Sequence, residues 1–430
     1  MKSLTVHPGK KLNGCVSLPG DKSISHRALL FGALALGETH VTNFLPGGDC
    51  MATLACLRAM GVEIETIRPT ELIVRGRGLH SLQPAQGALN CVRSGTTMRL
   101  LAGILAGQRF DSLLDGEEQL RRRPMRRVID PLQRMGAHIE SQDGRAPLKI
   151  CARALRGCDH QLEIASAQVK SALLLAGLFA EGITRVHEPG PSRDHTERML
   201  QAMGAAIHSD GNTVQIEAGQ ALHALPLRIP GDISSAAFPL VAALLAPQSE
   251  LTLKDVGVNP TRTGLLDVLQ IMGAAVKIGK VHFQGSEPTA DLTISSSTLR
   301  GTQVGGETVV RMIDEFPIFM VAATQAQGVT VVRDAAELRV KETDRIATAA
   351  AELQAMGARV ETLPDGFIVE GATPLRGAHV SSHGDHRLAM ALAVAGLIAS
   401  GETVIDDIDC AEDSFPGFVN LMRTIGAQYD

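Results

Sequence analysis

The stretch Leu57-Arg58-Ala59-Met60-Gly61-Val62-Glu63-Ile64 recurs, with small changes, six times along this chain. Leu and Met three residues apart share one helix face, and the Gly that follows is the residue that favours a left-handed helix end. Apolar and polar residues then alternate, as they do in a half-buried strand. The stretch therefore predicts a helix end followed by a strand. Its copies begin at Leu57, Leu132, Leu200, Leu269, Leu353 and Leu421.

A second pattern lies between these copies and also occurs six times. It consists of an apolar helix rich in small residues, a breaker and a strand. The breakers are Gly37, Gly107, Gly182, Pro247, Gly328 and Gly401. Together the two patterns predict an α/β protein whose repeats each contain two helices and several short strands.

A third repeat divides the chain into halves. Pro19-Gly20-Asp21 returns as Pro230-Gly231-Asp232, and three copies of the first pattern follow each. This predicts a first domain over 20–230 and a second over 1–19 plus 231–430, with chain crossings and hinges near 19–22 and 229–232. A linear α/β solenoid is the alternative. Two globules would leave a cleft between domains, where ligands commonly bind.

Composition excludes several classes of function. The net charge is −5, Trp is absent and aromatic residues make up 3% of the 430 residues, so a basic nucleic-acid binder or a base-stacking platform is not expected. The seven cysteines are scattered and form no CxxC pair, which argues against a disulfide framework or a zinc site. No signal peptide or membrane-spanning run is visible, and we expect a cytoplasmic protein.

Polar and basic residues begin three of the apolar helices in the first half. Lys22, Ser23 and Arg27 open the first, residues 93–99 the second and residues 166–171 the third. Free N–H groups and the macrodipole make helix starts good anion sites. Each segment alone is also consistent with ordinary capping, so their shared position in the repeats is the stronger signal.

Further charges gather in an arginine run and at helix starts in the second half. Five arginines lie within residues 121–127, and most of them are expected at the surface. Asp314 and Glu315 precede a predicted helix, residues 339–345 contain five charged side chains, and residues 384–387 open the last apolar helix. Acids at helix starts are common caps, and Lys341 and Arg345 could share a helix face without a ligand.

Taken together, these segments resemble the 5-enolpyruvylshikimate-3-phosphate (EPSP) synthase family over essentially the whole chain. The segments that carry the resemblance are 19–27, 94–99, 123–125, 166–171, 192–197, 339–345 and 384–387. The resemblance implies a two-domain α/β enolpyruvyl transferase fold, with three βαβαββ repeats in each domain. It also implies transfer of the enolpyruvyl group of phosphoenolpyruvate to the 5-hydroxyl of shikimate 3-phosphate, with release of phosphate.

The resemblance also implies two sets of binding residues. Shikimate 3-phosphate would be held by Lys22, Ser23, Arg27, Ser166, Gln168, Asp314 and Lys341. Phosphoenolpyruvate would be held by Lys22, Gly95, Arg123, Gln168, Arg345 and Arg387. The two substrates together carry about −5 to −6 charges, counting about −1.5 to −2 per phosphate, so a dense cationic site is needed. The domains are expected to close over them.

The reaction needs acid and base groups on different sides of the reacting carbon. We expect Asp314 to take the hydroxyl proton, Glu342 to protonate the methylene and Lys22 to neutralise the departing phosphate. Lys341 as the base, with a pKa lowered by neighbouring cations, is the rival assignment. No cofactor or metal is expected, because no His, Cys and carboxylate cluster has ligand spacing. We expect a monomer that binds these small molecules and neither nucleic acid nor membrane.

The chain departs from its relatives at two places. Val92-Arg93 stands where related sequences usually have Gly-Asn, and Asp413 stands where some relatives have Lys. An extra cation at position 93 could tighten or obstruct donor binding. Gly95 leaves room where some glyphosate-insensitive relatives have Ala, so a glyphosate-sensitive enzyme is compatible with the sequence, although Arg93 leaves this open.

Two other functions stay open. UDP-N-acetylglucosamine enolpyruvyl transferase shares the fold and the donor, but it typically has an early Lys-Asn pair and a loop cysteine, where this chain has Lys22-Ser23 and only Cys91 beside a helix start. A non-catalytic anion-binding protein on the same fold is supported only by Arg93. Retention of Asp314 and Glu342 argues against it, because simple binding needs no paired acids.

Overall fold

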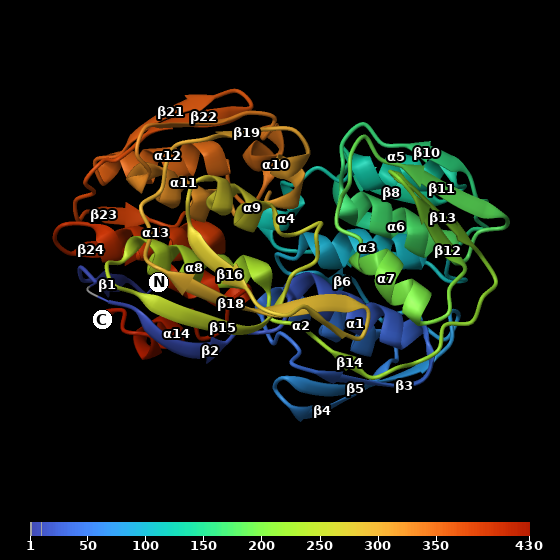
Figure 1. Cartoon of the computed structure of the whole chain (residues 1–430). Coiled ribbons are helices and arrows are strands. Elements are labelled where there is room, and N and C mark those ends of the chain that lie inside the picture. The colour runs from blue at the N-terminus through green and yellow to red at the C-terminus, as the bar shows by residue number, and fades with distance from the viewer. Residues whose placement is uncertain (1, 10) are drawn as a thin grey trace. The chain divides into compact units, whose positions relative to one another are not determined.

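The computed structural model describes residues 2–9 and 11–430; Met1 and Lys10, which fall within the expected second domain, lie outside the described residues. The chain forms two compact units (Figure 1). Unit 1 contains residues up to 21, 230–283 and 288–430, and unit 2 contains 22–229 and 284–287.

Unit 2 is built from three four-stranded sheets, with the strand orders β14-β3-β5-β4, β6-β7-β9-β8 and β10-β11-β13-β12. Its strands are β3 (Leu36–Thr42), β4 (Glu63–Arg68), β5 (Glu71–Arg77), β6 (Leu89–Asn90), β7 (Ser112–Asp115), β8 (His138–Gln142), β9 (Arg145–Cys151), β10 (Asp159–Gln161), β11 (Ile183–His187), β12 (Ile207–Asp210), β13 (Thr213–Glu217) and β14 (Leu227–Arg228). Its helices are α1 (Lys22–Leu34), α2 (Gly48–Ala59), α3 (Gly95–Ala106), α4 (Glu118–Arg121), α5 (Arg126–Arg134), α6 (Ala167–Gly177) and α7 (His195–Ala202).

Each complete repeat follows one plan. In the second repeat, β6 leads through α3 to β7, which pairs with β6 in parallel. The chain then passes through α4 and α5 to the antiparallel hairpin β8–β9, and β9 also pairs with β7. The third repeat does the same with β10, α6, β11, α7, β12 and β13. These sheets confirm the predicted βαβαββ repeat.

Three helices of unit 2 lie in its interior. Every residue of α3 from Thr97 to Ala106 is buried, and so is every residue of α6 from Val169 to Gly177. Their many small and apolar side chains suit this position, because a helix that is apolar all round must be covered on every side. The core of unit 2 joins α1, α3 and α6 to all three sheets, so the repeats share one core and are not stacked in a line as in a solenoid.

Unit 1 has the same organisation, with sheets in the orders β16-β18-β15-β2, β19-β20-β22-β21 and β1-β24-β23; β17 also pairs with β18. Its strands are β1 (Leu4–Val6), β2 (Asn13–Ser17), β15 (Glu250–Gly257), β16 (Ala275–Ile278), β17 (His282–Gln284), β18 (Glu287–Ser295), β19 (Gln303–Val304), β20 (Val329–Val332), β21 (Arg359–Leu363), β22 (Gly366–Glu370), β23 (His379–Ser381) and β24 (Thr403–Asp406). Its helices are α8 (Ile233–Leu245), α9 (Gly264–Ile271), α10 (Glu307–Arg311), α11 (Phe316–Gln325), η1 (Ala336–Val340), α12 (Arg345–Ala355), α13 (His386–Ile398), η2 (Ile408–Asp413) and α14 (Phe418–Thr424).

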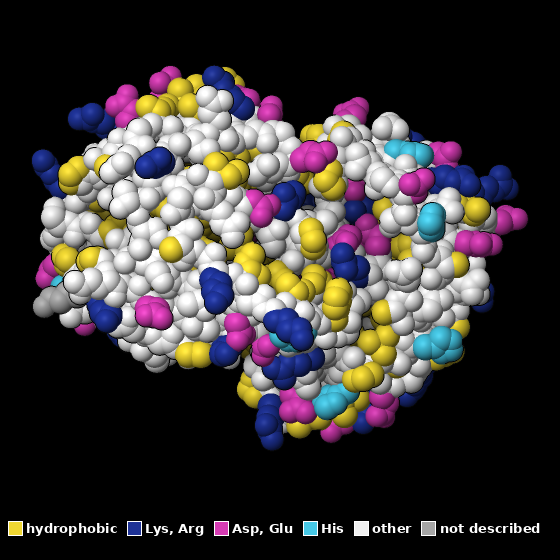
Figure 2. Space-filling model, viewed as in Figure 1, with side chains coloured by type: hydrophobic (Ala, Val, Ile, Leu, Met, Phe, Trp, Pro, Cys, Tyr) yellow, Lys and Arg dark blue, Asp and Glu magenta, His cyan; other side chains and the backbone are white. Residues whose placement is uncertain are grey.

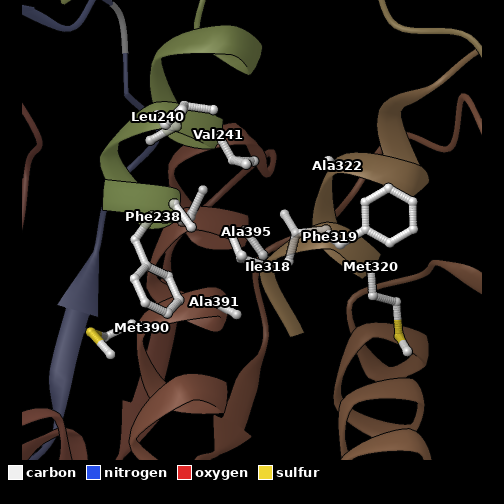
Figure 3. Packing of buried hydrophobic residues seen from close by; sticks show 14 of the residues in the cluster. Phe238, Leu240, Val241, Ile318, Phe319, Met320, Ala322, Met390, Ala391 and Ala395 are labelled. Atoms are coloured by element: carbon white, nitrogen blue, oxygen red, sulfur yellow. The ribbon is translucent and has the colours of Figure 1, made fainter. Parts of the chain in front are cut away.

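The interior helices of unit 1 are α8, α11 and α13, which pack against one another. Figure 3 shows their side chains meeting in one apolar layer, with Phe238 from α8, Ile318 from α11 and Ala395 from α13. Small residues on α13 let the helices approach closely, and Phe and Leu fill the remaining space. This packing holds the starts of α11 and α13, which carry predicted site residues, on a rigid base.

The chain passes between the units at the two Pro-Gly-Asp segments, besides the short excursion of residues 284–287, and the strand before each segment pairs within the unit that the chain is leaving. β2 leads into α1 but pairs with β15 of unit 1, whereas β14 leads into α8 but pairs with β3 of unit 2. Gly20 and Gly231 form an antiparallel bridge. Both acids of these segments are bound by one buried arginine, since Arg262 lies 3.0 Å from Asp21 and 3.4 Å from Asp232.

The glycines of the repeated Leu-Met-Gly pattern all have positive φ angles. Gly61 is at +81°, and the five later copies lie between +91° and +112°. Each directly follows the C-cap residue of a helix and stands before a strand, except that the last copy follows the final helix, α14. The predicted role of this glycine is confirmed, because only glycine adopts such angles without steric cost.

The surface carries both signs of charge. On the face seen in Figure 2, basic and acidic side chains are interspersed over each unit. Of the arginine run, Arg121 is paired with Asp115 and Arg122 with Glu118. Within residues 2–9 and 11–430, none of the helices combines the length and the apolar character that crossing a membrane would require.

Candidate active site

The predicted site residues of unit 2 lie at or before helix starts, and Arg99, which was not predicted, lies with them on α3. We call this group the basic cluster, and it consists of Lys22, Ser23 and Arg27 on α1, Gly95 and Arg99 on α3, Arg123 before α5, and Ser166 and Gln168 at the start of α6. The N–H groups at three helix starts and four cationic side chains thus belong to one unit, an arrangement suited to anions.

Gln168 links two of these helix starts. Its Oε1 accepts a hydrogen bond from Nη1 of Arg99 at 2.6 Å, and its Nε2 donates to Oγ1 of Thr96 at 2.9 Å. Arg99 is 1% exposed, so its guanidinium is fixed in the protein interior. The amide of Gln168 therefore has one orientation, with its donor and acceptor sides both defined.

Gly95 allows two arginines to approach the backbone of α3. A Cβ atom at this position would lie 2.7 Å from Nη1 of Arg99 and 3.0 Å from Nη1 of Arg123. Both distances are too short for a carbon beside a guanidinium nitrogen. Gly95 therefore leaves room for both guanidinium groups, which a larger residue would force to shift. Ser94 caps the helix by accepting from the N–H of Thr97 at 3.1 Å.

Arg27 and Lys22 are held by partners that differ in character. Nε of Arg27 donates to Oγ1 of Thr196 and Nη2 donates to Oγ of Ser171, both at 2.8 Å, while Nη1 donates to the Ser23 carbonyl at 2.9 Å. These hydroxyl and carbonyl partners are neutral. Lys22 instead lies 3.1 Å from Oδ2 of Asp49 on α2. Its ammonium is thus positioned by a carboxylate.

The second group lies in unit 1, and we call it the ionic cluster. It consists of Asp314, Glu315, Lys341, Glu342, Arg345, Asp385 and Arg387. Arg345 is its centre: its Nη2 lies 2.7 Å from Oε2 of Glu342 and its Nη1 lies 3.4 Å from Oδ1 of Asp314. Arg387 lies 3.6 Å from Oδ2 of Asp314. Both predicted acids, Asp314 and Glu342, therefore lie beside Arg345. Asp314 also lies near Arg387, the second arginine predicted to bind phosphoenolpyruvate.

Asp385 and Lys341 show how burial changes ionisation in this cluster. Burial alone would raise the pKa of Asp385, but the adjacent Arg345 guanidinium outweighs burial and lowers it. Burial lowers the pKa of the Lys341 ammonium, and Arg345 lowers it further, against the opposing carboxylates of Asp314 and Glu337. Lys341 is therefore the more readily deprotonated lysine that its rival assignment as a base requires.

Several neighbours of the site residues were not among the predicted ones. Asp49, Arg99 and Asp385 each position a predicted residue, although they lie 27, 69 and 40 positions from Lys22, Gln168 and Arg345, respectively. Residue spacing gives no sign of such pairs. The only available signal was their presence in charged segments at helix starts.

Two further expectations concern Arg93 and metals. Nε of Arg93 lies 3.7 Å from Oε2 of Glu117, and the Arg93 side chain is 36% exposed. Among the described residues, His138, Glu140 and Cys151 bring possible metal-ligand atoms within 4.8 Å of one another. They lie on the β8–β9 hairpin, which contains no predicted site residue, and Glu140 is already paired with Lys149 at 3.2 Å.

Comparisons with known proteins agree with this geometry. The family described as EPSP synthase (3-phosphoshikimate 1-carboxyvinyltransferase) matches residues 6–422. A 3-phosphoshikimate 1-carboxyvinyltransferase of Desulforudis audaxviator is 52% identical over 98% of this chain and 99% of its own length. One of Geobacter sulfurreducens is 51% identical over the full length of both chains.

Solved structures show the same relationship. EPSP synthase from Acinetobacter baumannii superposes with a TM-score of 0.90 at 43% identity, over 100% of this chain and 99% of that one. The enolpyruvyl transferase NikO from Streptomyces tendae has a TM-score of 0.82 at 20% identity, over 100% and 98% of the chains, which shows a shared fold. The basic and ionic clusters therefore lie in a known scaffold, and this chain belongs to the EPSP synthase (3-phosphoshikimate 1-carboxyvinyltransferase) family.

Proposed function

We propose that this chain transfers the enolpyruvyl group of phosphoenolpyruvate to the 5-hydroxyl of shikimate 3-phosphate and releases phosphate. Family membership supports this reaction. The observation that carries the assignment of residues is that Arg345 binds the carboxylates of both Asp314 and Glu342. Two acids on one buried guanidinium suit paired proton transfers, and simple anion binding would not need them.

The two clusters supply the charges that the substrates require. In this proposal shikimate 3-phosphate is held by Lys22, Ser23, Arg27, Ser166, Gln168, Asp314 and Lys341. Phosphoenolpyruvate is held by Lys22, Gly95, Arg123, Gln168, Arg345 and Arg387. The fixed amide of Gln168 and the close approach that Gly95 allows support their place in these sets.

The proposed chemistry is an addition followed by an elimination. Asp314 takes the proton of the 5-hydroxyl while Glu342 gives a proton to the methylene of phosphoenolpyruvate. The hydroxyl oxygen bonds to the central carbon and forms a tetrahedral intermediate. The carbon–oxygen bond to phosphate then breaks, the new methyl group loses a proton to Glu342, and Lys22 balances the charge on the leaving phosphate. No redox step or cofactor enters.

The organisation expected from the sequence is part of the same proposal. The domain of residues 20–230 would bind the acceptor, and the domain of 1–19 plus 231–430 would supply the acid and base groups. One copy of the chain contains every residue named, which supports a monomer as the functional form. We also place the enzyme in the cytoplasm, in the shikimate pathway of aromatic amino-acid biosynthesis.

Phosphate release tests this function directly. The protein is mixed with shikimate 3-phosphate and phosphoenolpyruvate, and each is omitted in turn. Release that requires both substrates is expected. Release with UDP-N-acetylglucosamine in place of shikimate 3-phosphate, or no release with either acceptor, would contradict the proposal.

A further inference from the structure

Unit 2 contains a buried ionic group to which the proposed mechanism gives no role. Nζ of Lys170 lies 2.7 Å from Oε2 of Glu188 and 2.7 Å from Oε1 of Glu197. The side chains of Lys170, Glu188 and Glu197 are 3%, 3% and 8% exposed, respectively. Burying three ionisable groups is costly, so stability alone does not explain the presence of such a group.

The pKa values of Lys170 and Glu197 respond to burial and to each other. Burial would lower the pKa of Lys170, but the carboxylates of Glu197 and Glu188 outweigh it and raise the pKa, so Lys170 is cationic. Burial also raises the pKa of Glu197, with Lys170 opposing the change. The ammonium of Lys170 therefore offsets the charge of the Glu188 carboxylate, 2.7 Å away, where both side chains are shielded from water.

Glu188 differs from Glu197 in having a second partner. Its Oε1 accepts a hydrogen bond from the backbone N–H of Ser166 at 3.2 Å. Ser166 is the N-cap residue of α6, and no side chain caps that helix start. The carboxylate of Glu188, which lies at the end of β11, thus fixes the turn that enters α6.

Lys170 closes the arrangement from within the helix. It lies four residues after Ser166, and its backbone N–H donates to the Ser166 carbonyl at 2.9 Å. Its ammonium also lies 3.5 Å from the carbonyl of Ser192 in the loop before α7. Both backbone polar groups of Ser166 are therefore tied to Lys170, the carbonyl directly and the N–H through Glu188.

We propose that Glu188, oriented by Lys170, is a positioning residue for the acceptor, because it fixes the turn from Ser166 to Gln168 that holds shikimate 3-phosphate. This inference rests on the proposed function. Since Lys170 offsets its charge, Glu188 can occupy a helix start beside an anion site without repelling the phosphate. Glu197 shares Lys170 and the burial but has no bond to Ser166, so it provides a matched control.

The test compares Glu188→Ala with Glu197→Ala. Binding of shikimate 3-phosphate is measured by calorimetry without donor, and kcat and KM are measured with both substrates. Loss of a charged hydrogen bond should weaken acceptor binding about ten- to hundredfold in Glu188→Ala, with a much smaller fall in kcat. Glu197→Ala should retain acceptor affinity within about threefold, although it removes a carboxylate from the same lysine.

Glutamine variants keep the comparison possible where an alanine variant does not fold. The amide oxygen of Glu188→Gln can still accept from the Ser166 N–H, so affinity should recover to within about tenfold of the wild type. Glu197→Gln should match the wild type. Equal affinities of Glu188→Ala and Glu197→Ala for shikimate 3-phosphate would overturn the role of Glu188. So would a Glu188→Gln variant that binds more than about tenfold more weakly than the wild type. A wild-type chain that binds no shikimate 3-phosphate would overturn the proposed function instead.

Discussion

Arg345 and Asp385 form a buried two-point ion pair in unit 1. Nε of Arg345 lies 2.8 Å from Oδ2 of Asp385, and Nη2 lies 3.2 Å from Oδ1. The side chains are 2% and 0% exposed, respectively. This fork fixes the plane of the guanidinium whose Nη1 and Nη2 atoms face Asp314 and Glu342. Asp385 thereby sets the direction in which Arg345 presents its charge.

Replacing Asp385 should weaken the proposed binding of phosphoenolpyruvate, because Arg345 would lose the partner that orients it. Asp385→Asn keeps an oxygen for the N–H of Arg387, 2.9 Å away in the native helix cap, but loses the charge that orients Arg345. We expect KM for phosphoenolpyruvate to rise about tenfold or more. Asp385→Ala should also lower the free energy of unfolding by about 3–5 kcal/mol.

Asp344 offers the control for this pair. It caps α12 by accepting from the N–H of Ala347 at 3.0 Å, and it forms an ion pair with Arg339. Asp344→Ala should cost about 1 kcal/mol of stability and leave KM for phosphoenolpyruvate near the wild-type value. A similar rise of KM in both variants would show that Asp385 acts only through stability.

The acids Asp314 and Glu342 should affect turnover far more than binding. Both face Arg345 and are only partly exposed, at 18% and 21% of their side chains. Asp314→Ala and Glu342→Ala should each reduce kcat about 100-fold or more, since general acid–base catalysis contributes about that much. The measurement is kcat beside the directly measured affinity for shikimate 3-phosphate. Near-normal kcat in either variant would remove that residue from the proton transfers.

The pH dependence separates Asp314 from Lys341 as the base. Burial lowers the pKa of Lys341, so a Lys341 base would be neutral only above that lowered pKa, and kcat would increase with pH through it. An Asp314 base does not depend on loss of the Lys341 proton. We therefore expect kcat not to rise with pH through the lowered Lys341 pKa, and to fall there as Lys341 loses its proton and its positive charge. A kcat that rises with pH through this pKa, and loses the rise in Lys341→Gln, would identify Lys341 as the base.

Gly95→Ala should weaken donor binding selectively. The new Cβ would lie 2.7 Å from Nη1 of the buried Arg99 and 3.0 Å from Nη1 of Arg123. Arg99 also holds Gln168 and cannot move freely. Overpacking of about 1–3 kcal/mol corresponds to a rise in KM for phosphoenolpyruvate of about five- to hundredfold. Affinity for shikimate 3-phosphate, measured without donor, should change less; an equal loss for both substrates would indicate a general disruption.

Val92 should be a point of strain that glycine relieves. Its φ angle is +52°, a left-handed conformation that is unfavourable for a β-branched residue. Hydrogen bonds hold it there, from its N–H to Oδ1 of Asn90 at 2.9 Å and from the N–H of Glu117 to its carbonyl at 2.8 Å. Such strain costs about 1–3 kcal/mol. Glycine would relieve it, but the greater entropy of the unfolded chain with glycine would offset about 0.5–1 kcal/mol of the gain.

Val92→Gly is therefore expected to raise the free energy of unfolding by about 1 kcal/mol, which would be measured as a higher urea midpoint. Arg93→Asn, the neighbouring change, should leave stability unaltered because Arg93 makes a half-exposed pair with Glu117. A lower midpoint in Val92→Gly would show that the native turn is not strained by valine.

The repeats could be predicted because they depend on local chemistry. The glycine after each Leu-Met pair has the positive φ angle that its position required, and the apolar helices occupy the interior as their composition indicated. The sequence placed residues 1–19 in the second domain, but it could not predict which strand they would join. β2 pairs with β15, more than two hundred residues away, and nothing in residues 13–17 specifies that partner.

The α/β repeat and the residue types at the helix starts could be read from the sequence, because helix ends, periodicity and charge are properties of neighbouring residues. Only the tertiary structure decided which of these residues meet. Arg345 reaches Asp385 across forty positions, and Ser166 reaches Glu188 across twenty-two, because separate elements pack side by side in one core. Burial lowers the pKa of Lys341, whereas charged partners brought in by the fold outweigh burial at the other two sites. Arg345 lowers the pKa of Asp385, and the carboxylates of Glu197 and Glu188 raise that of Lys170.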